Sequence, residues 1–254
     1  MNRISVIFKN PYEIELLQDS LPPPRKGEVL VQTHLSAISP GTEMLAYRGQ
    51  FPPNLPVDKN IAALMHDFKY PLKYGYTSIG RVVETGPAVS NGWLDRMVFC
   101  FNPHESHYVT HQDQLIPVPG DIDPADAVFL PNMESAVNFL MDGQPIIGEA
   151  VVVFGQGVVG LLAAAQLATL PLSCLVTLDK WPLRRKKSLD AGAHFTWDPA
   201  APDLQDKIAA LCESRSGNKN ADLIYELSGN PEALNQAVEI AGFGTRIVIG
   251  SWYG

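Results

Sequence analysis

Residues 150–162, with the sequence AVVVFGQGVVGLL, constrain the fold of this chain more than any other stretch. An apolar run of strand length leads into Gly-x-Gly-x-x-Gly, and a segment rich in leucine and alanine follows at once. This order of strand, glycine turn and helix is the fingerprint of a dinucleotide-binding unit. The stretch therefore predicts that the chain binds NAD(P). An ordinary strand–turn–helix is the alternative on the pattern alone.

Each residue of this turn has its own expected part in binding. Gly155 permits the sharp turn, and the missing Cβ of Gly157 lets a pyrophosphate approach the backbone. Gly160 lets the new helix pack closely on the strand. Val158 and Val159 occupy the first helical turn, where unpaired N–H groups and the positive end of the helix dipole attract phosphates.

Asp179 ends a second apolar run and lies 24 residues after Gly155. That spacing is close to the spacing of the acidic residue that hydrogen-bonds the adenosine ribose. A carboxylate there favours NAD, because the 2′-phosphate of NADP would meet a like charge. Lys180, Arg184 and Arg185 leave NADP open, since they could turn towards a phosphate. The two arginines also fit a solvated helix start.

Residues 1–130 are predicted to form a β-rich unit, because short apolar runs alternate with Pro- and Gly-containing turns. The expected strands are 3–8, 28–37, 79–84, 97–101, 107–109 and 114–118. Residues 49–73 are expected to form a long loop with one short helix at about 61–65.

Residues 131–254 are predicted to alternate between strands and helices, after helices at 123–127 and 132–141. The expected strands are 150–154, 173–178, 193–197, 221–227 and 245–250, and the helices between them are 158–169, 183–191, 203–214 and 231–241. This alternation predicts a parallel, doubly wound sheet and therefore an α/β fold class. The chain ends directly after the fifth strand, so we expect the sixth strand of a complete dinucleotide fold to be missing.

Composition excludes several classes of partner and site. The net charge of −8 and a pI near 5.2 argue against binding of nucleic acid or of an anionic membrane surface. No apolar run approaches the roughly 20 residues that span a bilayer, and no signal peptide is evident. Cys100, Cys174 and Cys212 are too widely spaced to indicate a disulfide framework or a zinc knuckle. A cytoplasmic protein is expected.

Two motifs in the first half carry a family resemblance. Residues 37–43 have the sequence AISPGTE, and residues 74–86 have the sequence YGYTSIGRVVETG. With the glycine turn, these motifs resemble the medium-chain dehydrogenase/reductase superfamily, and within it the branch of bacteriochlorophyllide dehydrogenase and threonine-dehydrogenase-like proteins. The resemblance implies a GroES-like β-barrel catalytic domain over residues 1–130 and a Rossmann dinucleotide-binding domain, lacking its final strand, over residues 131–254.

The positions of the family's catalytic zinc ligands are changed in this chain. The family uses Cys, His and a third Cys, Glu or Asp, and these positions correspond to Pro40, Tyr76 and about Pro131. Proline has no ligating side chain and a neutral tyrosine is a poor zinc ligand. The resemblance therefore implies a branch without zinc, while zinc chemistry with unusual ligands is a weaker alternative. A second set of residues with metal-binding side chains consists of His104, His107 and His111. On an extended segment these side chains would point in different directions, so metal binding there is not favoured.

Without zinc, hydrogen-bond donors must polarise a carbonyl group. Thr42 matches the Ser or Thr of the family's proton relay. Tyr76 is expected to project into the same cleft and to donate to the substrate oxygen, with Glu43 orienting the pair. The alternative is that Tyr76 only fills the space of the zinc. Ser39 and Lys73 are nearby polar residues for which a direct role is less favoured.

Further cofactor contacts follow from the resemblance and from the predicted sheet. Ser135 matches the Ser or Thr that approaches the nicotinamide. Ser228 and Gly229 follow one predicted strand, and Gly250 and Ser251 end another, at the carboxyl ends where ligands bind parallel sheets.

These residues lead to two hypotheses about function. The first is an NAD(P)-dependent oxidoreductase that transfers hydride between nicotinamide and an alcohol, carbonyl or activated alkene, without catalytic zinc. The second is a non-catalytic or truncated nucleotide-binding remnant of the same family. The expected partner is a small-molecule substrate. A homodimer is possible, although the strand that usually pairs the subunits is missing.

Overall fold

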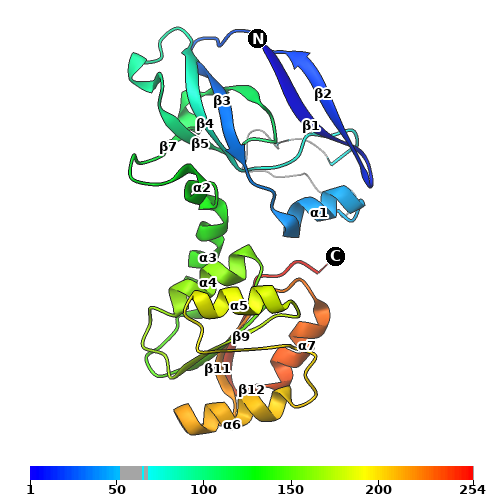
Figure 1. Cartoon of the computed structure of the whole chain (residues 1–254), viewed down its shortest axis with the longest axis vertical. Helices are drawn as coiled ribbons and strands as arrows, with labels where there is room; N and C mark the ends of the chain where they lie inside the picture. Colours follow the sequence, from blue (N-terminus) through cyan, green and yellow to red (C-terminus); the bar gives the residue numbers. More distant parts are fainter. Residues whose placement is uncertain (52–64, 66–67, 254) are drawn as a thin grey trace. The chain divides into compact units, whose positions relative to one another are not determined.

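The computed structural model describes residues 1–51, 65 and 68–253, and these form two compact units, Met1–Pro131 and Asn132–Tyr253 (Figure 1). The short helix predicted at 61–65 lies outside the described residues except for Met65. Among the described residues, no helix is long and apolar enough to cross a membrane.

The N-terminal unit is built on an antiparallel sheet with the strand order β6-β3-β4-β5-β7, and on a hairpin of β1 and β2. Val29, Val31, Val82 and Val98 are fully buried in the core beneath this sheet. The strands are β1 (Asn2–Asn10), β2 (Glu13–Ser20), β3 (Glu28–Ser36), β4 (Ser78–Thr85), β5 (Met97–Cys100), β6 (His107–His111) and β7 (Ile116–Pro117).

Three elements of this unit differ from the sequence prediction. Strand β2 was not predicted, because its alternation of acidic and apolar residues is short and breaks at Leu17; most of its side chains are exposed. Helix α1 (Pro40–Arg48) lies where no helix was predicted; it begins after Ser39 with proline in its first turn and ends at Gly49 in a left-handed conformation. The predicted strand 114–118 is reduced to β7, because residues Gln112–Gln114 form a 3₁₀ turn.

The remaining elements are the 3₁₀ turns η2 (Asn91–Trp93) and η3 (Gln112–Gln114), and the helices α2 (Pro124–Ala127) and α3 (Leu130–Gly143). Asp123 caps α2 by accepting a hydrogen bond from Ala125 N at 2.8 Å.

The C-terminal unit is a five-stranded parallel sheet with the order β10-β9-β8-β11-β12. Buried side chains on one face pack against α6 and α7, and those on the other face pack against α3 and α4 (Figure 1). The elements are β8 (Ala150–Phe154), α4 (Val158–Leu167), β9 (Cys174–Leu178), α5 (Pro182–Asp190), β10 (Phe195–Trp197), α6 (Leu204–Ser216), β11 (Ala221–Glu226), α7 (Pro231–Glu239) and β12 (Ala241–Ile249). The predicted α/β fold class, with a doubly wound parallel sheet after a β-rich unit, is confirmed.

The strand order reverses between β8 and β11, because β9 and β10 lie on one side of β8 while β11 and β12 lie on the other. Ligands of open parallel sheets bind at the carboxyl ends of the strands at such a switch point. The glycine turn, residues 155–160, follows β8 and therefore lies at this switch point.

Candidate functional site

The glycine turn is shaped by close backbone contacts. Gly155 has φ +85°, and a Cβ there would lie 2.6 Å from Ser228 Cα and 2.7 Å from Leu227 O. A Cβ on Gly160 would lie 1.9 Å from Gly155 O, so α4 packs directly on the turn. Around Gly157, by contrast, no described heavy atom lies within 4 Å of the Cβ position. The turn is thus tightly packed at its two ends and open in the middle.

This geometry fits a pyrophosphate. Gly157 is the N-cap of α4, and its missing side chain leaves the N-terminus of that helix accessible. Val158 and Val159 are the first two helical residues and are half-buried, so their backbone N–H groups stand where an anion is stabilised.

Asp179 lies directly against the same turn. Its side chain is buried, with Oδ2 accepting from Gln156 N at 2.8 Å and Oδ1 accepting from Trp181 N at 2.8 Å. A carboxylate has about four acceptor positions, so these two bonds leave capacity for a ribose hydroxyl. The structure brings Asp179 and the glycine turn together, as the spacing predicted.

The three cations near Asp179 differ in what they contact. Lys180 lies over the Trp181 ring, with its Nζ 5.2 Å from the ring centroid. Arg185 donates to Asp179 O at 2.7 Å and to Asp198 Oδ2 at 3.2 Å, which fixes it in the fold. The exposed Arg184 has its Nη1 3.6 Å from Asp179 Oδ2. Of the two arginines, Arg184 is therefore the one with greater freedom to meet a phosphate.

A buried carboxylate that the sequence did not single out lies at the end of β11. Glu226 is fully buried, and its Oε1 accepts from Ser228 N at 2.8 Å and from Ser228 Oγ at 2.5 Å. Its Oε2 accepts a hydrogen bond from Tyr253. Burial, together with this bond, raises the pKa of the Tyr253 phenol to about 12. The sequence signal that could have identified Glu226 is its place as an acidic residue at the end of an apolar strand.

The other residues predicted to contact the cofactor lie in the same unit. Ser251 Oγ accepts from Gly229 N at 2.8 Å, so the loops after β11 and β12 are joined. A Cβ on Gly250 would lie 2.4 Å from the Phe139 ring, which explains the glycine. Ser135 is half-buried on α3.

In the N-terminal unit, Tyr76 forms a short hydrogen bond with Ser39, a residue for which the sequence analysis favoured no direct role. Its hydroxyl donates to Ser39 Oγ at 2.5 Å. We call Tyr76 and Ser39 the hydroxyl pair. Thr42 is half-buried on α1, and among the described residues no hydrogen bond joins it to Tyr76. Phenol and hydroxyl groups held in this way can polarise a carbonyl oxygen or transfer a proton.

Glu43 contacts the hydroxyl pair and a histidine. The carboxylate is buried, and its Oε1 accepts from Ser39 N at 2.7 Å. Its Oε2 lies 2.8 Å from His104 Nε2, and His104 Nδ1 lies 2.9 Å from Ser36 Oγ. The sequence singled out His104 only as a metal-like residue and gave no signal for its contact with Glu43.

The positions of the family's zinc ligands have other contacts here. Pro40 is the first residue of α1, and the Tyr76 hydroxyl donates to Ser39 Oγ. His107 contacts Ser106, and His111 contacts Asp113. Within the described part of the chain, no group of three or more His, Cys, Asp or Glu side chains could hold a metal ion. These residues therefore do not fit the family's zinc site.

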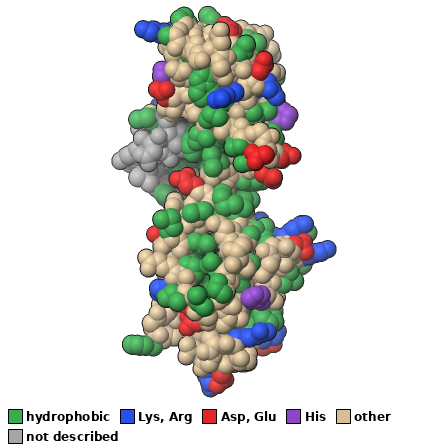
Figure 2. Space-filling view, turned by 90° about the vertical axis from the view of Figure 1, so that its left-hand side faces the viewer, with side chains coloured by type: hydrophobic (Ala, Val, Ile, Leu, Met, Phe, Trp, Pro, Cys, Tyr) green, Lys and Arg blue, Asp and Glu red, His purple; other side chains and the backbone are tan. Residues whose placement is uncertain are grey.

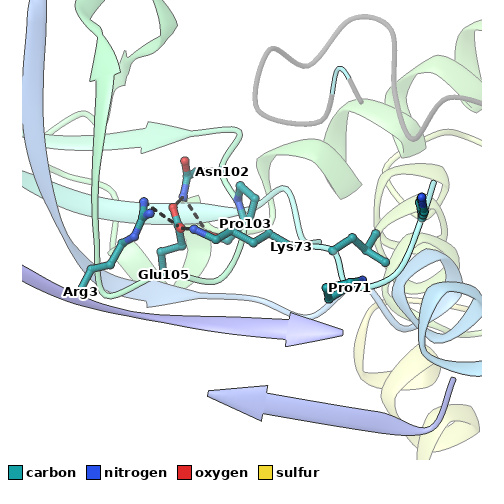
Figure 3. A pocket seen from close by; sticks show the side chains of 8 residues that line it. Arg3, Pro71, Lys73, Asn102, Pro103 and Glu105 are labelled. Carbon is teal, nitrogen blue, oxygen red and sulfur yellow. Dashed lines mark hydrogen bonds and ion pairs between the residues drawn. The ribbon is translucent and has the colours of Figure 1, made fainter. Parts of the chain in front are cut away.

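A cavity of about 380 Å³ in the N-terminal unit is organised around Glu105 (Figure 3). This buried carboxylate accepts from Lys73 at 2.5 Å, Ser5 at 3.0 Å and Asn102 at 3.1 Å, and lies 3.2 Å from Arg3 Nη1. The cavity is lined by Arg3, Lys69, Pro71, Leu72, Lys73, Asn102, Pro103 and Glu105. Since the network ties β1 to the segment that carries His104, we assign it a structural role.

The sequence of this chain is similar to the sequences of several dehydrogenases. No family model matches the chain. It is 30% identical to an L-threonine 3-dehydrogenase of Bacillus subtilis (strain 168) over 52% of this chain and 36% of that protein. It is 26% identical to a 2-desacetyl-2-hydroxyethyl bacteriochlorophyllide A dehydrogenase of Cereibacter sphaeroides over 100% of this chain and 75% of that protein. The chain thus matches about a third of the threonine dehydrogenase.

Solved structures share the fold over nearly the whole chain. An alcohol dehydrogenase of Escherichia coli CFT073 complexed with NADH matches with a TM-score of 0.79 at 19% identity, covering 100% of this chain and 77% of the other. A zinc-binding dehydrogenase of Sinorhizobium meliloti 1021 bound to NADP matches with a TM-score of 0.81 at 19% identity, covering 100% and 78%. In sequence, this chain is thus similar to dehydrogenases of the medium-chain dehydrogenase/reductase superfamily, as its motifs predicted, and it shares their fold.

Proposed function

We propose that this protein is an NAD(P)-dependent oxidoreductase that transfers hydride between nicotinamide and an alcohol, carbonyl or activated alkene in a small-molecule substrate. The observation that carries the proposal is the glycine turn at the switch point of the sheet, packed at Gly155 and Gly160 and open at Gly157. The dehydrogenase names of the sequence relatives support the reaction class.

The cofactor supplies the hydride chemistry when it is bound, and the protein supplies binding and orientation. Gly157, Val158 and Val159 present backbone N–H groups to the pyrophosphate, and Asp179 accepts from the ribose. Ser135, Ser228, Gly250 and Ser251 are assigned to the remaining cofactor contacts. These assignments are proposals for this chain.

We further propose that catalysis proceeds without zinc, with Tyr76 as the proton donor to the substrate oxygen once Ser39 reverses the hydrogen bond and donates its own proton to the Tyr76 oxygen. The short bond to Ser39 supports a directed hydroxyl rather than a side chain that only fills space. Thr42 and Glu43 are assigned supporting parts, Thr42 beside the substrate and Glu43 as the group that holds Ser39. A positioned acid of this kind contributes about 10²–10⁴-fold to rate.

NADH is expected to raise the melting temperature of chelator-treated protein. A ligand at 100 times its Kd stabilises the native state by about 2.7 kcal/mol, which corresponds to roughly 5–10 °C for a chain of this size. NADPH at the same concentration should give a smaller shift, because its 2′-phosphate would meet the Asp179 carboxylate. Differential scanning fluorimetry measures both. No shift with either nucleotide at millimolar concentration would contradict the proposal.

The second candidate, a nucleotide-binding protein without catalysis, is favoured by the replacement of the zinc ligands with Pro40 and Tyr76. It predicts the same thermal shift with NADH but no turnover on alcohols, ketones, quinones or enones. Turnover that depends on Tyr76 would decide for the enzyme.

A further inference from the structure

We propose that His104 is a positioning residue that holds both members of the hydroxyl pair in place; this rests on the proposed function, in which Tyr76 donates the proton. His104 contacts Glu43, whose carboxylate accepts a hydrogen bond from Ser39 N. It also packs against Gly75, the residue before Tyr76. It is the residue through which two segments separated in the sequence are locked together.

The first link runs through Glu43. The buried carboxylate uses one oxygen for Ser39 N, at 2.7 Å, and the other for His104 Nε2, at 2.8 Å. A buried carboxylate requires donors for both oxygens, because an unpaired one costs the full desolvation penalty. Loss of His104 would therefore free Glu43 to seek another partner and would loosen its hold on Ser39.

The second link runs through Gly75. A Cβ at this position would lie 2.7 Å from His104 Cδ2 and 2.7 Å from Nε2, so the imidazole ring lies directly on the Gly75 backbone. Gly75 also has φ +112°, a conformation that side chains rarely adopt. Tyr76 follows Gly75 directly. The His104 ring therefore restricts the position of the Tyr76 backbone.

The ring itself is held from the other side. Ser36 Oγ lies 2.9 Å from Nδ1, and a neutral imidazole with its proton on Nε2 satisfies both this contact and Glu43. The backbone at His104 is fixed too. His104 O accepts from Val6 N at 2.9 Å, and the next residue, Glu105, is anchored by ion pairs with Arg3 and Lys73.

These contacts give His104 a part that the family's motifs do not describe. At the positions of two zinc ligands the chain has Pro40 and Tyr76, and the buried acid Glu43 contacts a histidine. The histidine does not reach the substrate in this account. It keeps the Tyr76 oxygen 2.5 Å from Ser39 Oγ and so fixes the position from which Tyr76 donates to the substrate.

The test compares His104→Ala and His104→Gln with His107→Gln. His107 lies on the next strand and contacts Ser106, so its variant removes a histidine without touching Glu43. The first readout is the downfield proton resonance of the Tyr76 hydroxyl, assigned as the line that Tyr76→Phe removes. We expect this line in the unmodified protein and in His107→Gln, and its loss or upfield shift in His104→Ala.

The second readout separates positioning from folding and from cofactor binding. NADH affinity should stay within twofold in all three variants, because its assigned contacts lie in the other unit. Turnover should fall about 10-fold or more in His104→Ala, since a small displacement of a catalytic group has effects of that order. His104→Gln keeps a donor for Glu43 and should lie between; it also carries the test if the alanine variant does not fold.

Two outcomes overturn the inference. One is an unchanged Tyr76 hydroxyl line with turnover within twofold in both His104 variants, and the other is no Tyr76-dependent line in the unmodified protein. Absence of NADH binding and turnover in the unmodified protein would instead defeat the proposed function, while the hydroxyl line would still report on His104.

Discussion

Replacing Gly160 with alanine is expected to lower the free energy of unfolding by about 3 kcal/mol or more, at the upper end of what overpacking costs. The added Cβ would lie 1.9 Å from Gly155 O, and neither backbone can move without shifting α4 away from β8. The expected fall in melting temperature is roughly 6–12 °C. Thermal and urea unfolding without cofactor measure this loss.

Gly157→Ala is the matched control, because nothing described lies within 4 Å of its Cβ position and its φ is −71°. Its melting temperature without cofactor should stay close to that of the unmodified protein, but its Kd for NADH should rise at least 10-fold. The methyl group would occupy the place of the pyrophosphate. Equal losses of stability in the two variants would contradict this division between a packing glycine and a binding glycine.

Replacing Tyr76 with phenylalanine is expected to lower kcat at least 100-fold on any substrate that the protein turns over. The change removes one oxygen, which in this account protonates or deprotonates the substrate oxygen, and removal of a positioned general acid costs about 10²–10⁴-fold. The KM for NADH should change little, because the cofactor contacts are assigned to other residues. Steady-state kinetics in both reaction directions provide the measurement.

Tyr47→Phe is the matched control for this prediction. Its hydroxyl donates to Tyr12 O at 3.2 Å in an exposed position, and not to a member of the hydroxyl pair. That variant should keep its kcat within twofold. A Tyr76→Phe enzyme with unchanged kcat would show that Tyr76 only fills space, which was the alternative left open by the sequence.

The parallel sheet was predictable because its signals are local. Each buried strand is a short apolar run, each helix follows at a regular interval, and the glycine turn marks where the first strand meets its helix. The contact of Asp179 with this turn followed from spacing, since consecutive parallel strands place their carboxyl ends at one edge. The hydrogen bond from Gln156 N to Asp179 joins the ends of two such strands.

The N-terminal unit was less predictable because its structure depends on distant contacts. Strand β2 is recognisable mainly by its pairing with β1, since its own side chains are largely exposed. The bond between Glu43 and His104 joins residues 61 positions apart, and neither has a periodic or motif signal for the other. In the C-terminal unit, Glu226 has a local signal, since it is an acidic residue that ends an apolar strand, but its contact with Tyr253 joins residues 27 positions apart.

Charge supports a small-molecule partner over a polyanion. On the face drawn in Figure 2, Lys and Arg side chains lie among acidic ones and form no broad basic patch over either unit. With a net charge of −8, a nucleic acid would meet mainly like charge.

The most direct measurement is a calorimetric titration of NADH into chelator-treated protein, with Gly157→Ala titrated in parallel. We expect saturable binding at one site per chain without added metal, and a Kd at least 10-fold higher for the variant. Heats that show no saturation up to millimolar NADH, or equal affinity in both proteins, would contradict the claim that the glycine turn binds the cofactor.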